Sequence, residues 1–176
     1  MPVVKIDHLS LAFVGHAQTV AALQDISLHV DAGEIVGLVG ESGSGKSAAA
    51  MSILRLLPEA KAEYPGGRIT VLNHDVLAAP RRQLQDMRGG EVAMIFQEPM
   101  TALNPVLRVR EQVTDVILRH RPMSRAAALQ LALGLLRDMH IDDPERVLNA
   151  YPHELSGGMR QRVMIAMAFS CHPKMI

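Results

Sequence analysis

The fold of this chain is decided by the stretch Gly40-Glu41-Ser42-Gly43-Ser44-Gly45-Lys46-Ser47. It fits the pattern G-x-x-x-x-G-K-[ST], in which glycines let the backbone curl so that successive N–H groups point at a phosphate. The continuous apolar run Ile35–Val39 before it predicts a strand buried on both faces. The helix-forming residues Lys46–Leu57 after it predict a helix that Pro58 ends. Strand, glycine loop and helix in this order predict a phosphate-binding loop.

Two side chains of this loop have expected roles in binding a nucleotide. Lys46 is expected to reach the β- and γ-phosphates as a point charge, and the Ser47 hydroxyl is expected to ligate Mg²⁺. The backbone around the phosphates is expected to come from Gly40, Glu41, Ser42, Gly43, Ser44 and Gly45. The alternative is a glycine turn that binds nothing, and such a loop alone does not separate a kinase from a GTPase or a transporter motor.

Composition bounds the class of protein. The chain has 176 residues, 48% of them hydrophobic, which is enough apolar material for a sizeable core. Its 18 basic residues balance 18 acidic ones, so no excess positive charge attracts nucleic acid or an anionic membrane over long range. The apolar runs fall short of the roughly 20 residues that span a bilayer, and the N-terminus lacks a signal-peptide pattern. We therefore expect a cytoplasmic chain whose membrane partners are proteins, with Cys171 as a small buried hydrophobic residue.

Short Val-, Ile- and Leu-rich runs alternate with helical patterns, which predicts an α/β fold with a largely parallel sheet. Further strands are expected at Val4–Phe13, Leu23–Val30, Ile69–Leu72 and Val92–Phe96. Helices are expected at Val109–His120, from an N-cap at Ser124 to about Met139, after the cap Asp143-Pro144, and at Gly157–Ser170. The basic residues of Pro80-Arg81-Arg82 are expected to form a solvated face.

A second glycine motif, Leu155-Ser156-Gly157-Gly158-Met159-Arg160-Gln161-Arg162, lies far downstream of the loop. Ser156 is expected to be an N-cap, and Gly157 and Gly158 are expected to expose the first amides of the helix, which makes a second anion site. The alternative is an ordinary capped helix after a glycine turn. Two phosphate sites and one nucleotide suggest that two chains pair.

This second motif resembles the signature sequence of ATP-binding-cassette (ABC) proteins, and with the loop upstream the chain is identified as a member of that family over residues 4–176. The resemblance implies the P-loop NTPase fold of ABC ATPases. That fold has a largely parallel central sheet, an N-terminal antiparallel β subdomain and an inserted α-helical subdomain, here with its C-terminal part missing. Residues 1–176 would then form a single incomplete nucleotide-binding domain. Its core ATP-binding lobe would be 1–103 and 163–176, and its helical subdomain with the signature 104–162.

The resemblance also assigns site residues. In this family the signature of one subunit closes over the γ-phosphate held by another, which implies that residues 156–158 serve a partner's ATP. The segment Ile95–Pro105 resembles the Q-loop, which implies that Gln97 offers an amide oxygen to Mg²⁺ or to the attacking water while the following loop moves the helical block. Phe13 stands where the family places an aromatic ring that stacks on adenine, and a core Phe is the alternative.

The residues around these motifs are similar to those of the dipeptide, oligopeptide, nickel and glutathione importers. The similar segments are Gln97-Glu98-Pro99-Met100, Leu103-Asn104-Pro105 and Tyr151-Pro152-His153-Glu154. This implies the ATP-binding motor subunit of an importer of peptides or similar small solutes, with ATP and Mg²⁺ as cofactors. It would lie peripherally on the cytoplasmic face of the inner membrane. Its partners would be a second ABC ATPase subunit, identical or not, integral membrane permease subunits and, indirectly, a solute-binding protein, but no nucleic acid.

Two other functions stay open: a soluble ABC ATPase acting on nucleic acid or ribosomes, and a non-catalytic nucleotide-binding fragment that binds a complete subunit. After Ile176 the resemblance implies a strand with a carboxylate for Mg²⁺ and a glutamate that polarises water. We therefore expect the 176 residues alone to hydrolyse ATP negligibly. We also expect the strand before the phosphate-binding loop to keep uncovered apolar faces.

Overall fold

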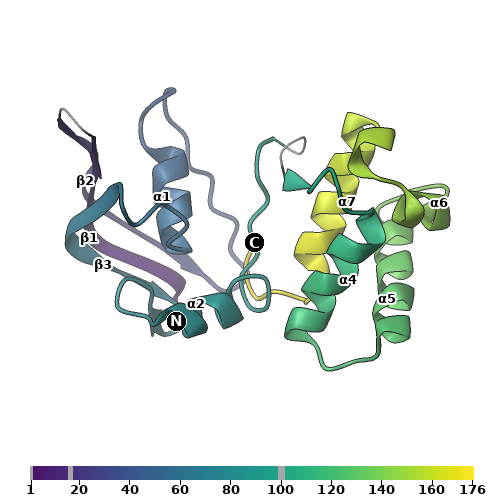
Figure 1. Ribbon diagram of the computed structural model, residues 1–176. Coiled ribbons are helices and arrows are strands. Elements are labelled where there is room, and N and C mark those ends of the chain that lie inside the picture. The colour runs from purple at the N-terminus through teal and green to yellow at the C-terminus, as the bar shows by residue number, and fades with distance from the viewer. Residues whose placement is uncertain (1, 16–17, 99–101) are drawn as a thin grey trace. The chain divides into compact units, whose positions relative to one another are not determined.

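The computed structural model describes residues 2–15, 18–98 and 102–176. The chain forms two compact units, of which the first ends at Leu84 and the second is Gln85–Ile176. The first unit is built on a sheet and the second on packed helices (Figure 1).

The sheet of the first unit is antiparallel and has the strand order β2-β1-β3-β4. Its strands are β1 (Pro2–Val14), β2 (Thr19–Asp31), β3 (Ala62–Val71) and β4 (His74–Asp75). Val4 of β1 lies opposite Val30 of β2 and Val71 of β3. The strands expected at 4–13 and 23–30 are confirmed and extend further at both ends, whereas β4 was not expected.

An irregularity in the middle of β1 and β2 keeps the apolar side chains on one face of the sheet. The buried residues change from Val4 and Ile6 to Leu9 and Leu11, a shift of one residue that a β-bulge produces. His8 and Asp25 both have a φ of 49° there, and their ring nitrogen and carboxylate lie 2.7 Å apart. The alternation of the strands therefore continues into the core despite the extra residue.

Helix α1 (Lys46–Ile53) packs on this sheet (Figure 1). The buried Ser52 hydroxyl donates to the Ala48 carbonyl at 2.7 Å and accepts a hydrogen bond from the Tyr64 hydroxyl of β3 at 3.2 Å. The helix ends four residues before the expected Leu57, because Arg55 adopts a φ of 48° and its guanidinium donates to backbone carbonyls at residues 77 and 79.

The strand expected at Ile35–Val39 is not formed. All five residues are exposed, with Ile35 99% and Val39 93% exposed, and no described residue pairs with them. A strand that lacks hydrogen-bonded neighbours has nothing to hold its backbone or to cover its side chains. The prediction of a buried strand is therefore wrong here, while the expectation of uncovered apolar faces is confirmed.

The strand expected at Val92–Phe96 is reduced to bridges at its first residue. Val92 pairs in parallel with Arg88 and with Met175, and the Ala93 N–H donates to the Met175 carbonyl at 3.0 Å. Within the described residues, parallel pairing is limited to these bridges. Their direction is nevertheless the one expected for the central sheet.

The helices of the second unit follow one another along the chain, and α2, the first of them, begins before the boundary between the units. They are α2 (Arg81–Met87), α4 (Val109–His120), α5 (Arg125–Asp138), α6 (Pro144–Asn149), the 3₁₀ turn η1 (Pro152–Glu154) and α7 (Gly157–Phe169). The expected N-caps are confirmed, because Ser124 accepts from the Ala127 N–H at 3.2 Å and Asp143 from the Arg146 N–H at 3.1 Å. Arg81 is exposed as expected, but the helix that it begins, like η1, was not expected.

The core of the second unit lies between α4, α5 and α7, and includes Val109, Val113, Ile117, Ala132, Leu136, Leu155 and Val163. Gln112 of α4 fastens the preceding loop, since its amide donates to the carbonyls of Asn104 at 3.0 Å and Leu107 at 2.9 Å. Among the helices of the described ranges, none has the length and apolarity needed to cross a membrane.

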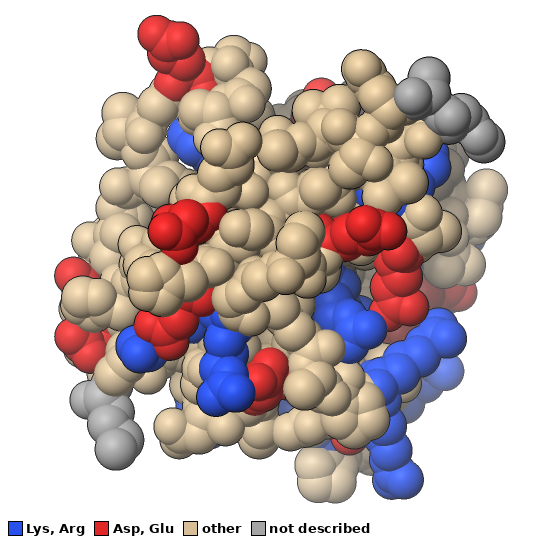
Figure 2. Space-filling view, turned by 90° about the vertical axis from the view of Figure 1, so that its left-hand side faces the viewer, with Lys and Arg blue, Asp and Glu red and all other residues tan. Residues whose placement is uncertain are grey.

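Charged side chains of both signs are interspersed on the face drawn in Figure 2, which agrees with the balance of 18 basic and 18 acidic residues. The ion pairs of the sheet, such as Lys5 with Asp7 at 2.9 Å, are partly exposed to solvent. Pairs of this kind contribute about 0–1 kcal/mol each, so the fold depends on its apolar cores.

Candidate nucleotide-binding site

The expected phosphate-binding loop has a backbone that only glycine adopts without strain. Gly43 and Gly45 have φ values of 82° and 88°, in the left-handed region. A Cβ on Gly45 would lie 2.7 Å from Cδ2 of Leu23 and 2.8 Å from the carbonyl oxygen of Ala22. The loop is therefore fitted closely against β2 at the point where it enters α1.

Lys46 is the first residue of α1, and its ammonium lies in the curl of the loop. Its Nζ donates to the Gly40 carbonyl at 2.8 Å, to the Glu41 carbonyl, and to Oγ of Ser44 at 3.3 Å. The N-cap of α1 is Gly45, which has no side chain to cap the helix, and Ser47 is exposed beside Lys46. One ammonium group and the positive end of a helix thus meet at the same place, an arrangement that suits a phosphate group.

Phe13 belongs to the same unit as the loop. It lies in β1 opposite Val20, and two residues further along β2 is Ala22, whose carbonyl faces Gly45. Its side chain is half-buried, so part of the ring stays accessible. β2 thus connects the strand end that carries Phe13 with the loop, and stacking on adenine stays a prediction.

Ser156, at the second glycine motif, is the N-cap of α7, as expected, and its Oγ accepts from the Met159 N–H at 3.3 Å. Ser156, Gly157 and Gly158 are all exposed. A Cβ on either glycine would meet nothing within 4 Å among the described residues. Glycine in a helix is about 1 kcal/mol less favourable than alanine, so packing within this chain does not explain these two residues.

Residues just before α7 hold the motif in place. Leu155 is buried, and the Glu154 carboxylate accepts from the Tyr151 N–H at 2.7 Å. The Arg108 guanidinium lies over the Tyr151 ring, 5.2 Å from its centroid, and the His153 ring stacks on Tyr151 with centroids 5.6 Å apart. No local sequence pattern predicts the stack of these three side chains, because it joins two segments that are distant along the chain.

Gln97 lies in the second unit, in an exposed segment that follows the Val92 bridges. Part of the expected Q-loop, Pro99–Thr101, lies outside the described residues, so its shape there is not described. The structure thus places Phe13 and the phosphate-binding loop in the first unit, and Gln97 and the Ser156 turn in the second.

The oxygen atoms available for Mg²⁺ are few. Within residues 2–15, 18–98 and 102–176, no three or more His, Cys, Asp or Glu residues gather to hold a metal. Mg²⁺ prefers oxygen ligands and usually keeps several waters beside one or two protein groups and the phosphates of a substrate. The exposed Ser47 hydroxyl and the Gln97 amide oxygen are of the type that such a nucleotide-bound ion needs.

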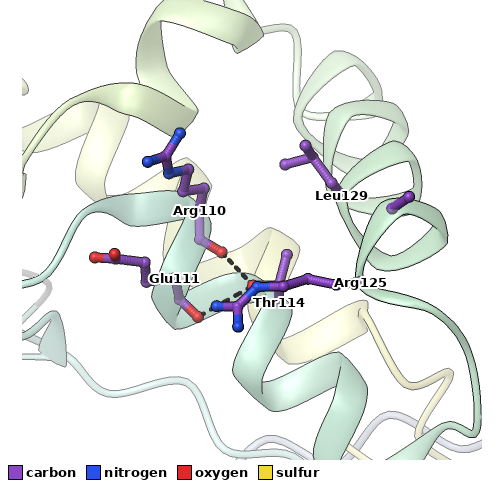
Figure 3. Close-up of a pocket in the computed structure, with 6 residues that line it drawn as sticks. Arg110, Glu111, Thr114, Arg125 and Leu129 are labelled. Atoms are coloured by element: carbon purple, nitrogen blue, oxygen red, sulfur yellow. Dashed lines mark hydrogen bonds between the residues drawn. The ribbon is translucent and has the colours of Figure 1, made fainter.

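A pocket of about 380 Å³ lies between α4 and α5 (Figure 3). It is lined by Arg110, Glu111, Thr114, Arg125, Ala126 and Leu129. The Thr114 hydroxyl donates to the carbonyls of Arg110 at 2.7 Å and Glu111 at 3.3 Å, so it is already satisfied within α4. None of the site residues expected from the sequence is among the residues that line this pocket.

Replacing Gly45 by alanine should destabilise the first unit by about 1–3 kcal/mol, because left-handed strain and the contacts with β2 act together. Thermal or urea unfolding of the purified protein measures this. Two matched variants separate the causes: Gly43→Ala adds strain alone, since its Cβ would meet none of the described part of the chain within 4 Å, and Gly37→Ala adds neither. Equal stability of the Gly45 and Gly37 variants would contradict this account of the loop.

Comparison with known proteins identifies relatives of the whole chain. The family described as ABC transporter matches residues 23–176. The probable D,D-dipeptide transport ATP-binding protein DdpD of Escherichia coli (strain K12) is 55% identical over 175 residues, 99% of this chain and 53% of that protein. The oligopeptide transport ATP-binding protein OppD of Bacillus subtilis (strain 168) is 40% identical over 172 residues, 98% of this chain and 48% of that protein. The chain thus spans about half the length of the curated relatives it matches.

Solved structures show the same fold. The dimeric structure of a post-hydrolysis state of the ATP-binding cassette MJ0796, bound to ADP and Pi, has a TM-score of 0.84 and is 28% identical. The match covers 97% of this chain and 70% of that one. The predicted fold class is thereby confirmed.

Proposed function

Because this chain belongs to the ABC transporter family, we propose that it is the ATP-binding motor subunit of an importer, coupling ATP binding and hydrolysis to uptake of peptides or similar small solutes. The observation that carries this proposal is the Lys46 ammonium, held in the glycine loop at the N-terminus of α1. Relatives named for transport of D,D-dipeptides and oligopeptides support peptides as the cargo.

The first unit binds ATP in this proposal. Lys46 exchanges its loop oxygens for the β- and γ-phosphates, which are stronger acceptors because they are charged. Successive amides of residues 40–45 and the first turn of α1 donate to the β-phosphate. Phe13 stacks on the adenine, a contact that adds affinity without selecting the base by hydrogen bonds.

Ser47 and Gln97 would hold Mg²⁺, and the charge of the ion would offset that of the phosphates. Ser47 contributes its hydroxyl oxygen and Gln97 its amide oxygen. Gln97 also orients the attacking water, since its amide can accept one hydrogen bond while it donates another. Gln97 therefore links the state of the nucleotide to the chain segment that leads into the helices.

The Ser156–Gly158 turn serves the ATP of a second cassette, identical or paralogous. Its exposed amides and the dipole of α7 favour an anion, and its glycines leave room for another chain to approach. The dimeric MJ0796 cassette bound to ADP and Pi supports such a pair. In a head-to-tail dimer each ATP is then enclosed by the Lys46 loop of one subunit and the Ser156 turn of the other.

The remaining partners follow from the transport function. We assign the core ATP-binding lobe to residues 1–103 and 163–176 and the helical subdomain to 104–162. The helical subdomain transmits closure of the dimer to integral membrane permease subunits, and a solute-binding protein delivers cargo to these. The chain then lies on the cytoplasmic face of the membrane as a peripheral subunit. Relatives named as transport ATP-binding proteins support this assembly.

Gln97→Ala tests the proposal in the full-length protein. ATP affinity should change little, because Lys46 supplies most of the phosphate binding, whereas phosphate release should slow roughly 10²-fold when the water loses its orientation. Gln130→Ala, which removes an exposed glutamine of α5, is the control. A Gln97→Ala protein that hydrolyses ATP as fast as the control would overturn the role given to Gln97.

A further inference from the structure

His120 ends α4, and its ring lies against the backbone of Gly89 and Gly90. A Cβ on Gly89 would lie 3.1 Å from Nε2 of His120, and a Cβ on Gly90 would lie 2.9 Å from Nδ1. Gly89 also has a φ of 85°, in the left-handed region. A Cβ on Gly90 would also lie 2.8 Å from the Asp86 carbonyl oxygen, so a side chain there would press on both the ring and the backbone before it. The glycine pair thus leaves the space that the imidazole occupies.

The turn that receives this ring leads directly to Gln97. The Gly89 N–H donates to the Val92 carbonyl at 2.8 Å, and the N–H groups of Glu91 and Val92 both donate to the Met87 carbonyl at 3.0 Å. Val92 is in turn the residue of the parallel bridges, after which the chain continues to Gln97. The position of the turn therefore sets where the exposed segment with Gln97 begins.

Ion pairs also lie at this end of α4 and on the turn. Arg119 and Asp86 form an ion pair at 2.9 Å, but their side chains are 54% and 57% exposed, and such pairs contribute about 0–1 kcal/mol. Glu91, on the same turn, pairs with Lys174 at 2.9 Å. The half-buried ring is a further contact between α4 and the turn, made directly on the backbone of Gly89 and Gly90.

We propose that His120 is a positioning residue, which holds the Gly89–Gly90 turn against the end of α4 and so passes movements of the helices to Gln97. The inference rests on the role proposed for Gln97. It adds a physical connection between Gln97 and the helical subdomain. In this connection the flat ring of His120 lies on the backbone of two glycines, which have no side chains.

Partial burial and, after it, the neighbouring Arg119 lower the pKa of His120 below its usual 6.5, while Asp86 acts in the opposite direction. The ring is therefore uncharged at neutral pH. The folded protein binds fewer protons than the unfolded chain between the lowered pKa and about 6.5, so this contact loses stability as the pH falls through that window. Protonation places a charge against the turn, faced by Arg119 and Asp86. The turn itself carries Glu91, which pairs with Lys174.

Three variants of the full-length protein test the inference through ATP affinity and phosphate release. His120→Ala should slow phosphate release about tenfold with ATP affinity unchanged, since misplacing a reacting group by an ångström can cost up to 100-fold. His120→Phe, which keeps a flat ring, should restore most of the rate. Gly90→Ala should slow it as His120→Ala does, because its methyl group would crowd both Nδ1 of His120 and the Asp86 carbonyl oxygen and so separate the turn from the ring. The exposed His29→Ala is the control.

The pH dependence of phosphate release separates a positioning role of His120 from a role in folding alone. Phosphate release by the unchanged protein should fall between pH 6.5 and the lowered pKa of His120, and this acid limb should be absent from His120→Phe. A His120→Phe protein that binds ATP but is as slow as His120→Ala, or a Gly90→Ala protein with full activity, would overturn the inference. Failure of the proposed function itself looks different, because Gln97→Ala would then leave phosphate release unchanged.

Discussion

Lys46→Ala in the full-length protein is expected to weaken ATP binding about 100-fold. The ammonium makes three hydrogen bonds to loop oxygens and exchanges them for charged phosphate oxygens, and hydrogen bonds to charged groups contribute about 1.5–3 kcal/mol each. Alanine leaves the phosphates without their point charge. Titration with a fluorescent ATP analogue, or calorimetry, measures the loss.

The matched control is Lys61→Ala, which removes an exposed lysine from the same unit. Lys46→Arg is a second comparison, which keeps the positive charge but changes its shape. The planar guanidinium does not replace the compact ammonium in a closed loop. ATP affinity that is unchanged in a folded Lys46→Ala protein would show that the loop is a glycine turn without a ligand.

Gly158→Asp is expected to slow ATP hydrolysis about 100-fold or more, while leaving the ATP affinity and the stability of the fold unchanged. A Cβ at this position meets none of the described residues within 4 Å, and a carboxylate in the first turn of α7 is favourable to the helix dipole. The substitution therefore does no harm within the chain. When the turn faces the γ-phosphate of a second cassette, however, the Asp carboxylate lies against the negatively charged phosphate. The two charges then repel each other in a site closed to water.

Phosphate release and ATP-dependent dimerisation on a sizing column measure this effect. Gly158→Ala adds volume without charge, should stabilise α7 slightly, and should reduce the rate less than Gly158→Asp. If Gly158→Asp proteins dimerise and hydrolyse ATP normally, the Ser156 turn does not face a partner's nucleotide.

Features that depend on a few neighbouring residues were predicted well from the sequence. The N-caps Ser124, Asp143 and Ser156 lie where expected, since a cap is a contact between a side chain and an amide three residues away. The curl around Lys46 was expected for the same reason, because the loop glycines determine it locally.

Features that depend on distant partners were not predicted. The apolar run Ile35–Val39 has the composition of a buried strand, but composition does not supply the neighbouring strand that would cover it. The contact of His120 with Gly89 and Gly90 joins segments about thirty residues apart, and neither glycine belongs to a recognisable motif. The end of α1 was placed too late, because nothing local announces the left-handed Arg55.

The central claim is that the Lys46 loop and the Ser156 turn of one chain serve different ATP molecules. An ATP analogue with a photoreactive group on its γ-phosphate tests it in an assembly of a Lys46→Ala copy with an intact second cassette. The account predicts that the Lys46→Ala copy is labelled at residues 156–158, by nucleotide that the other subunit holds. Label that reaches residues 156–158 only in chains whose own Lys46 is intact would contradict it.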